Sequence, residues 1–129
     1  ITPQQVPHFD AISTESAGDQ ATAALLDSGV SIDAIFCASD LIAIGVMRCL
    51  KRRGINVPEQ IAVMGFDDIP AASFASPGLS TIQQDTSKAG ELLVNNLLKL
   101  INNQPITDTL IEPKLVVRQS CGAAGNSAS

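Results

Sequence analysis

Three apolar runs of this chain end directly on acidic residues. A-I-F-C-A-S-D ends at Asp40, A-V-M-G-F-D-D ends at Asp67 and Asp68, and S-T-I-Q-Q-D ends at Asp85. A short apolar run without polar alternation is typical of a strand buried on both faces of a parallel sheet. The carboxyl ends of such strands meet at one edge, where open α/β sheets bind ligands. The sequence therefore predicts a small, hydroxyl-rich ligand at that edge.

Helical patterns separate the expected strands. We expect helices at 16–28, 41–53, 69–75 and 88–101, strands at 33–38, 61–66 and 79–84, and an extended segment at 109–120. Ser39 or Asp40 is expected to cap the second helix, and Ser87 the last. Gly45 inside the second helix costs about 1 kcal/mol relative to Ala, which a close approach to the sheet would offset. The alternation of strands and helices predicts an α/β fold, with a mainly parallel sheet and helices on both faces.

Composition excludes several classes of protein. A chain of 129 residues suffices for one modest domain, and 45% hydrophobic with only 3% aromatic residues predicts an aliphatic core. Eight Lys and Arg against thirteen Asp and Glu give a net charge of −5, which repels nucleic acid phosphates. The three cysteines lack metal-site spacing and are odd in number, so we expect a reducing cytoplasm rather than a disulfide framework. Neither a signal peptide nor a membrane-length apolar run is recognisable.

Candidates for catalysis are scarce. His8 is the only histidine, and we expect it to lie at the surface. The sequence contains no G-x-S-x-G nucleophile motif and no glycine-rich phosphate loop. Asp67 and Asp68 have the oxygen ligands that Mg²⁺ prefers, but a receiver-like site needs its acid pair after the first strand and a lysine after a late one. Here the pair comes late and Lys88 belongs to a helical pattern, so we expect no catalytic residue, no metal and no cofactor.

The polar residues at the strand ends have different expected roles. Asp40 and Asp68 each precede a helical pattern, and a carboxylate there satisfies N–H groups that otherwise lack partners. Both are therefore expected to be helix caps. Asp67 lies one residue earlier, directly at the strand end, where its carboxylate would project into the crevice. Gln84 and Ser39 lie at equivalent edges, so these three residues are the first candidates for ligand contact.

Four longer strings carry a resemblance to a known family. They are A-I-F-C-A-S-D-L-I-A-I-G, G-I-N-V-P-E-Q-I-A-V-M-G-F-D-D-I-P-A-A, S-P-G-L-S-T-I-Q-Q-D and K-L-V-V-R-Q-S, within residues 15–120. They resemble the lactose-repressor/galactose-repressor family of bacterial transcription regulators, in the later part of the effector-binding core. The resemblance implies a periplasmic-binding-protein-like fold of type I, in which two α/β subdomains clamp an effector. Only part of this two-subdomain core is expected in the chain.

The resemblance also implies roles for single residues. Asp67 matches the acid that hydrogen-bonds a sugar hydroxyl, and Gln84 lies at a hinge crossing beside the cleft. Ser39 stands where the family often has an asparagine that contacts the effector. Ile12 and Thr86 stand where many members stack an aromatic ring on a sugar face. Because neither is aromatic here, we expect a sugar-like or nucleoside-like effector that need not be an ordinary hexose.

The implied organisation is that of one segment of a larger regulator. Residues 1–122 would form the later portion of the effector-binding core, with 84–112 crossing to the other subdomain and 123–129 forming a disordered tail. The family's helix-turn-helix head is not in this sequence, so operator DNA is expected to be bound only through that head. The expected partners are a small-molecule effector and further copies of the chain, as a homodimer or higher oligomer, with no membrane.

Two other functions stay open at this point. The first is a periplasmic-type sugar-binding protein of a transporter, which would share the fold. The second is a Mg²⁺-dependent phosphoryl-transfer enzyme that uses Asp67 and Asp68. An effector-binding segment of a cytoplasmic regulator, without enzymatic activity, is the leading hypothesis.

Overall fold

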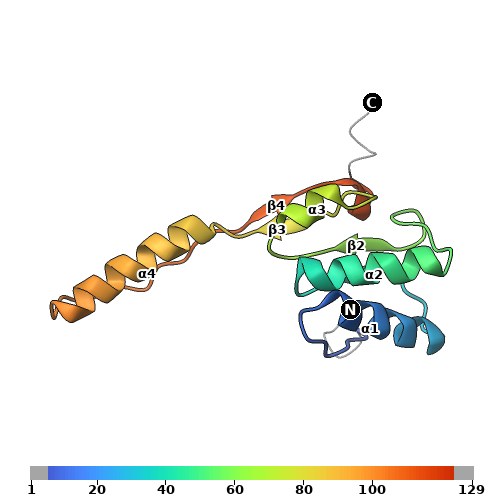
Figure 1. Ribbon diagram of the computed structural model, residues 1–129, viewed down its shortest axis with the longest axis horizontal. Helices are drawn as coiled ribbons and strands as arrows, with labels where there is room; N and C mark the ends of the chain where they lie inside the picture. The colour runs from blue at the N-terminus through green and yellow to red at the C-terminus, as the bar shows by residue number, and fades with distance from the viewer. Residues whose placement is uncertain (1–5, 124–129) are drawn as a thin grey trace.

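The computed structural model describes residues 6–123 (Figure 1). Its elements are α1 (Glu15–Asp27), β1 (Ala34–Phe36), α2 (Asp40–Arg52), β2 (Ala62–Met64), α3 (Pro70–Phe74), β3 (Thr81–Gln83), α4 (Thr86–Ile101), β4 (Lys114–Val116) and the short 3-10 helix η2 (Gln119–Cys121). Every helix and strand expected from the sequence is present, with shorter strands. Apart from residue 123, the expected disordered tail lies outside the described residues.

The four strands form one continuous hydrogen-bonded arrangement. β1 pairs with β2 in parallel, and β3 pairs with β4 antiparallel. Two parallel bridges, Met64 to Ser80 and Asp67 to Gln83, join β2 to β3. The order in space is therefore β1, β2, β3, β4, and the pairing is parallel except at β4. The prediction of a mainly parallel sheet is confirmed. This order brings the carboxyl ends of β2 and β3 side by side.

The core is aliphatic and lies between the sheet and α2. Its buried members are Cys37, Ala43, Val46, Met47, Leu50, Ile61, Val63, Ala72 and Leu79. Ile35 of β1 packs against this cluster, whereas the next residue, Phe36, is 63% exposed. The expectation that β1 is buried on both faces is wrong, because Ala34 and Phe36, which alternate with Ile35 along the strand, are both exposed.

Helices α1 and α2 pack against each other at two glycines. A Cβ atom at Gly45 of α2 would overlap the backbone carbonyl of Glu15, and a Cβ at Gly18 of α1 would overlap that of Ile42. The close approach that Gly45 permits is therefore to α1, and the expected approach to the sheet is wrong. The absence of a side chain at both positions lets the two backbones come into direct contact.

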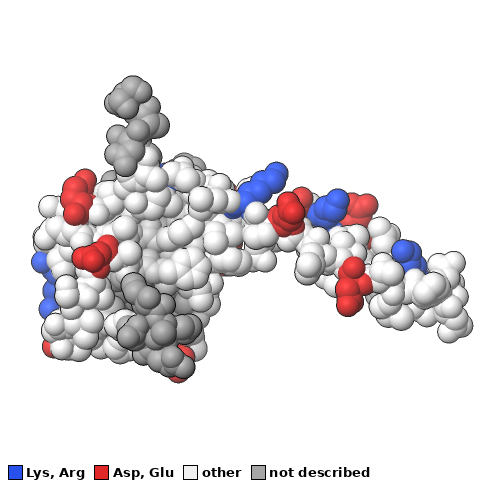
Figure 2. All heavy atoms as spheres, turned by 180° about the vertical axis from the view of Figure 1, so that it is seen from behind, with Lys and Arg blue, Asp and Glu red and all other residues white. Residues whose placement is uncertain are grey.

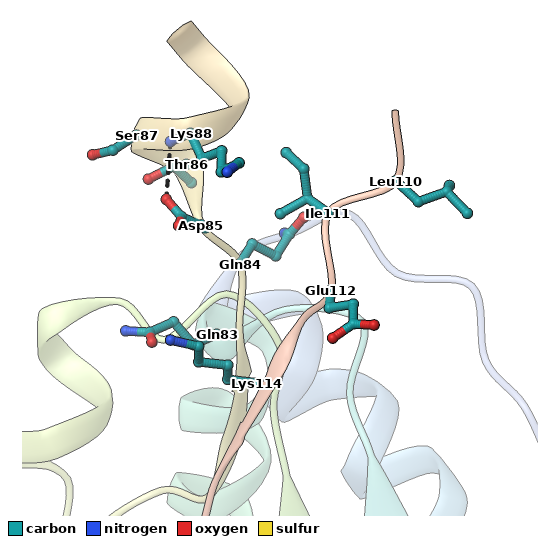
Figure 3. Close-up of a pocket in the computed structure, with 10 residues that line it drawn as sticks. All are labelled: Gln83, Gln84, Asp85, Thr86, Ser87, Lys88, Leu110, Ile111, Glu112 and Lys114. Carbon is teal, nitrogen blue, oxygen red and sulfur yellow. Dashed lines mark hydrogen bonds between the residues drawn. The ribbon is translucent and has the colours of Figure 1, made fainter. Parts of the chain in front are cut away.

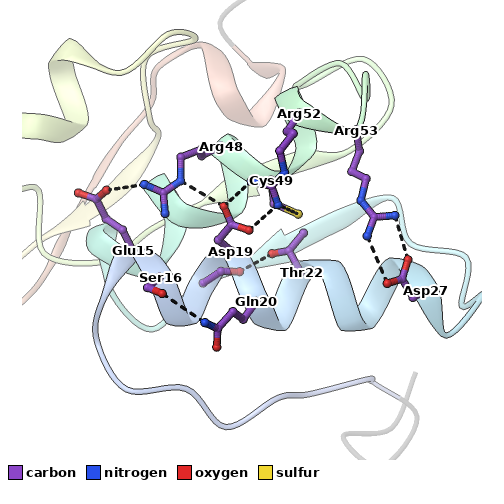
Figure 4. A network of polar contacts seen from close by, with 11 residues as sticks. Glu15, Ser16, Asp19, Gln20, Thr22, Asp27, Arg48, Cys49, Arg52 and Arg53 are labelled. Atoms are coloured by element: carbon purple, nitrogen blue, oxygen red, sulfur yellow. Dashed lines mark hydrogen bonds and ion pairs between the residues drawn. The ribbon is translucent and has the colours of Figure 1, made fainter.

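Ion pairs cover the solvent side of the same helix contact (Figure 4). Asp19 binds Arg52 at 2.6 Å and Arg48 at 3.1 Å. Further pairs join Arg48 to Glu15 at 3.3 Å and Arg53 to Asp27 at 2.9 Å. Arg52 holds the pKa of Asp19 well below its ordinary value, mainly through its hydrogen bond. These pairs fix the register of α1 against α2 more than they stabilise the fold, because exposed ion pairs contribute little.

Helix α4 extends away from the body as an arm, and the chain returns beside it to β4 (Figure 1). Asp85 caps this helix, because its Oδ1 accepts a hydrogen bond from Lys88 N at 2.9 Å. The expected cap at Ser87 is wrong, since that residue already lies inside the helix. No residue of α4 is buried. Among residues 6–123, no helix is long and apolar enough to cross a membrane.

Candidate ligand site at the ends of β2 and β3

Asp67 and Gln84 meet beyond the ends of β2 and β3. Gln84 Nε2 donates a hydrogen bond of 2.9 Å to Asp67 Oδ1. Asp67 is half-buried and Gln84 is exposed, so both reach solvent. Within the described residues, this is the only hydrogen bond that the Asp67 side chain makes. A carboxylate with a free oxygen beside an amide can accept from and donate to the hydroxyl groups of one small molecule.

The backbone at Asp67 and Asp68 has an unusual conformation. Their φ angles are 116° and 57°, in the left-handed region that non-glycine residues rarely adopt. Such residues cost about 1–3 kcal/mol each and persist only where their surroundings hold them. On one side, Asp67 N donates to the carbonyl of Ile82 on β3 at 2.9 Å. The turn after β2 is therefore tied to the neighbouring strand at its first residue.

The side chain of Asp68 points to a different set of partners. Its Oδ1 pairs with Arg118 at 2.8 Å, and its Oδ2 accepts from Gln83 Nε2 at 3.1 Å. The expectation that Asp68 caps the next helix is wrong. That helix, α3, begins after Ile69 without any side-chain cap and with Pro70 at its first position, where no N–H group needs a partner.

Asp40 has a structural role other than the expected cap. Ser39 is the N-cap of α2, because its backbone is extended and its Oγ accepts from Ile42 N at 3.3 Å. Asp40 is already the first helical residue, and its side chain is fully buried. It accepts from Ile69 N at 2.8 Å and from Thr81 Oγ1 at 2.6 Å. The prediction that Asp40 caps α2 is therefore wrong.

Two further candidates, Ser39 and Ile12, lie close together in the structure. Ser13 Oγ donates to Ser39 Oγ at 2.6 Å, and the neighbouring Ile12 is 75% exposed. Ser39 is buried, and its oxygen has both the cap bond and this second partner. The contacts of Ser39 thus lead to the 12–13 segment, and in the described part of the chain none joins it to Asp67.

Thr86 and Gln84 line a hollow of about 560 Å³ at the root of the arm (Figure 3). Its walls are the end of β3, the start of α4 and the chain that returns to β4. The lining residues are Gln83, Gln84, Asp85, Thr86, Ser87, Lys88, Leu110, Ile111, Glu112 and Lys114. The volume is in the range of small-molecule sites. Asp67 is not part of this wall, and it meets Gln84 from the side of β2. Gln84 is therefore the residue that connects the hollow to the Asp67 turn.

A second hollow, of about 410 Å³, lies beside β1 and is lined mostly by apolar side chains. Phe9, Ala21, Leu25 and Ile35 are among them. Such a lining suits an apolar group and offers few partners to a hydroxyl-rich ligand.

Three residues that hold the turn in place are not predicted from the sequence as site residues. Thr81 and Arg118 make the contacts that hold the Asp68 side of the turn, and Gln83 adds a third. A weak signal existed for two of them, since Thr81 is a polar residue in a predicted strand and Arg118 is one of three charged residues, with Glu112 and Lys114, in the extended segment. Neither signal says which acid would be the partner, because the partners lie 13 and 50 residues away along the chain.

The chain is similar to known proteins over most of its length. A family model for the periplasmic binding protein-like domain matches residues 2–121. The ribose operon repressor of Haemophilus influenzae is 39% identical over 89 residues, covering 67% of this chain and 27% of the repressor. The lac repressor dimer bound to operator and an anti-inducer superposes with a TM-score of 0.79 at 33% identity, covering 83% of this chain and 38% of that one. A LacI family regulator from Arthrobacter sp. FB24, in complex with lactose, gives 0.76 at 35%, covering 86% and 42%.

The fold is thus that of a periplasmic-binding-protein-like domain, incomplete in extent. The chain belongs to this family, in the group of LacI-type transcriptional regulators. It spans only about 27% of the length of the Haemophilus repressor.

Proposed function

We propose that this chain is the effector-binding segment of a LacI/GalR-type transcriptional regulator, without enzymatic activity of its own. The observation that carries the proposal is the hydrogen bond between Gln84 and Asp67, which brings an amide and a half-buried carboxylate together at the strand ends. This is the edge at which open α/β sheets bind small molecules. The ligand is a sugar-like or nucleoside-like molecule whose hydroxyl groups bind Asp67.

Other candidate contacts fit the same ligand to different degrees. Thr86 lines the hollow beside Gln84, and Ile12 is exposed and available for apolar contact. Ser39 already accepts two hydrogen bonds, so it would contact a ligand group by donating its own O–H. The lactose complex of the Arthrobacter relative supports a carbohydrate as the class of ligand.

The organisation of the larger protein is also proposed. Residues 1–122 belong to the later portion of the core, and 84–112 cross to the other subdomain. The arm supports this division, because the chain leaves the body after β3 and returns to it at β4 (Figure 1). Ligand-driven closure of the two subdomains would change the affinity of a separate head for operator DNA. A homodimer in the cytoplasm is the proposed form, as expected for a regulator.

Two alternatives have less support. A sugar-binding protein of a transporter would share the fold, but the curated relatives described above are regulators. A Mg²⁺-dependent phosphoryl-transfer enzyme would need oxygen ligands from both acids of the turn. Asp68 already uses one oxygen for Arg118 and the other for Gln83, so the pair is poorly suited to hold a cation.

The substitution Asp67→Asn tests the proposal. Asn keeps the shape but removes the charge, and a hydrogen bond to a charged group is worth about 1.5–3 kcal/mol. We expect affinity to fall roughly ten- to a hundredfold. Calorimetry on the native protein with D-ribose, lactose and a panel of nucleosides measures this. Asp108→Asn removes the same charge from the returning segment and should leave affinity unchanged.

Two results would contradict the proposal. The first is a ligand from this panel that binds wild type and a folded Asp67→Asn variant equally well. The second is a native protein that none of the sugars or nucleosides stabilises in a thermal melt, since a ligand that binds only the folded state must raise the melting temperature.

A further inference from the structure

The carboxylate of Asp40 is the most deeply buried charged group in the described chain. It is fully buried at the start of α2, and a buried charge is strongly unfavourable unless hydrogen bonds compensate it. Each of its oxygens has one partner, Ile69 N for Oδ2 and Thr81 Oγ1 for Oδ1. As a helix cap this carboxylate would be redundant, because Ser39 already fills that role.

Both partners of Asp40 hold the turn that carries the candidate ligand residue. Ile69 directly follows Asp68, so its N–H fixes the far end of the two left-handed residues. Thr81 donates to Asp40 and also accepts from Asp68 N at 3.4 Å. The near end of the turn is held by the bond from Asp67 N to β3. Thr81, Gln83 and Arg118 contact Asp68 itself. Asp40 adds the bond to Ile69 N, at the end of the turn, and orients the Thr81 hydroxyl.

We propose that Asp40 is a positioning residue for the ligand site: its buried carboxylate holds the Asp67–Asp68 turn in the left-handed conformation that directs the Asp67 side chain toward Gln84. This role rests on the proposed function, because it matters for ligand binding only if Asp67 contacts the ligand. Asp40 itself, being fully buried, would make no ligand contact.

Gly65 gives independent support for this arrangement. A Cβ atom at Gly65 would overlap Asp40 Oδ1, so the missing side chain leaves the space that the carboxylate occupies. Gly65 directly follows β2, before the turn, and has no left-handed φ that would itself require glycine. The glycine is therefore explained by the room that Asp40 needs.

The effect of Asp40 on the turn can be measured without any ligand. In Asp40→Asn and in Gly65→Ala we expect the amide of Ile69 to exchange with solvent about tenfold faster. A tenfold change corresponds to about 1.4 kcal/mol, close to the lower value for one hydrogen bond to a charged group. The φ-dependent NMR couplings of Asp67 and Asp68 should move toward those of ordinary backbone. Thr81→Val, which keeps the shape of the side chain, should produce a weaker change of the same kind.

A double-mutant cycle tests the connection to the ligand. We expect Asp40→Asn to weaken binding of D-ribose or lactose about tenfold, and to have little further effect in an Asp67→Asn background, because it acts through that residue. Val63→Ala is the matched control. It creates a core cavity and lowers the melting temperature, but should leave the couplings of the turn and the affinity unchanged.

The outcomes separate the two proposals. Unchanged Ile69 exchange and unchanged couplings in both Asp40→Asn and Gly65→Ala would overturn the positioning role, and so would additive losses in the cycle. A turn that responds in a protein that binds none of the sugars or nucleosides would support control of the turn by Asp40 and overturn the proposed function alone.

Discussion

Gly45 of α2 lies against the backbone carbonyl of Glu15 on α1, so closely that no side chain fits between them. Gly18 of α1 makes the reciprocal approach to the carbonyl of Ile42. Backbone on both sides limits how far either helix can shift. The close approach of α1 and α2 therefore depends on glycine at both positions.

The first prediction is that Gly45→Ala destabilises the protein. Alanine gains about 1 kcal/mol of helix propensity, but overpacking against backbone costs typically about 1–3 kcal/mol and sometimes more. We expect a net loss of about 1–2 kcal/mol in urea denaturation. Gly90→Ala in α4 is the control, because a Cβ there meets nothing within 4 Å, so that substitution should be neutral or stabilising. Equal effects of the two substitutions would show that the helix contact is not tight.

The second prediction concerns acid sensitivity at Asp19. Its pKa is lowered from the ordinary value of 3.8, mainly by the hydrogen bond from Arg52. A lowered folded pKa stabilises the protein above the unfolded value, and this stabilisation is lost as the pH falls through the folded value. Asp19→Asn should therefore lower the melting temperature at pH 7. The difference from wild type should shrink as the pH falls below about 4.

Thermal melts between pH 7 and pH 2 measure this difference. Asp108→Asn serves as the control, because Asp108 forms no ion pair in the part of the chain that the structure describes. A difference between wild type and Asp19→Asn that stays constant with pH would contradict the electrostatic explanation.

The sequence predicts the elements well and the side-chain partners poorly. Apolar runs and helical periodicity depend on local residues, so the strand around Val63 and the helix after Ser39 are foreseeable. The role of Asp40 is not, since its partners are 29 and 41 residues away and become neighbours only when β1, β2 and β3 align. Local capping rules favour Asp40 as a cap because they consider only neighbouring residues. The burial of its carboxylate depends on how the strands of the sheet align.

The exposure of Phe36 has a similar explanation. An apolar run predicts burial on both faces, but burial also depends on which elements cover each face. The sequence predicts only that Gln84 and Asp67 lie at the same edge of the sheet. Their direct hydrogen bond depends on the left-handed turn at Asp67, which no residue pattern indicates because glycine is absent there.

The third prediction concerns the cysteines. Cys37 and Cys49 are buried, and burial raises the pKa of the Cys37 thiol to about 12 and also raises that of Cys49. Since the thiolate is the reactive form, both should react slowly in the folded protein. A thiol reagent at pH 8 should therefore label Cys121 first, and Cys121→Ser should remove the fast phase. A fast phase that survives this substitution would show that the core around Cys37 opens readily.

The last prediction is that the chain associates with further copies of itself through α4. Six large apolar side chains of this helix are exposed: Leu93, Val94, Leu97, Leu98, Leu100 and Ile101. Figure 2 shows uncharged surface along most of the arm, between a few charged side chains. Exposed apolar area of this kind is rare on a stable monomer and is usually covered by a partner.

Substitutions on one face of α4 test this association. Leu93 and Leu97, 71% and 57% exposed, lie one helical turn apart and on the same side. Changing both to Gln keeps the helix propensity nearly constant while removing apolar surface. Sedimentation at micromolar concentration should give a dimer or larger assembly for wild type and a monomer for the double variant.

Leu110→Gln, at a position that is 97% exposed but outside the helix, should not change the assembly. A wild-type chain that sediments as a monomer, unfolds cooperatively and binds no apolar dye would show that α4 is covered within a single chain.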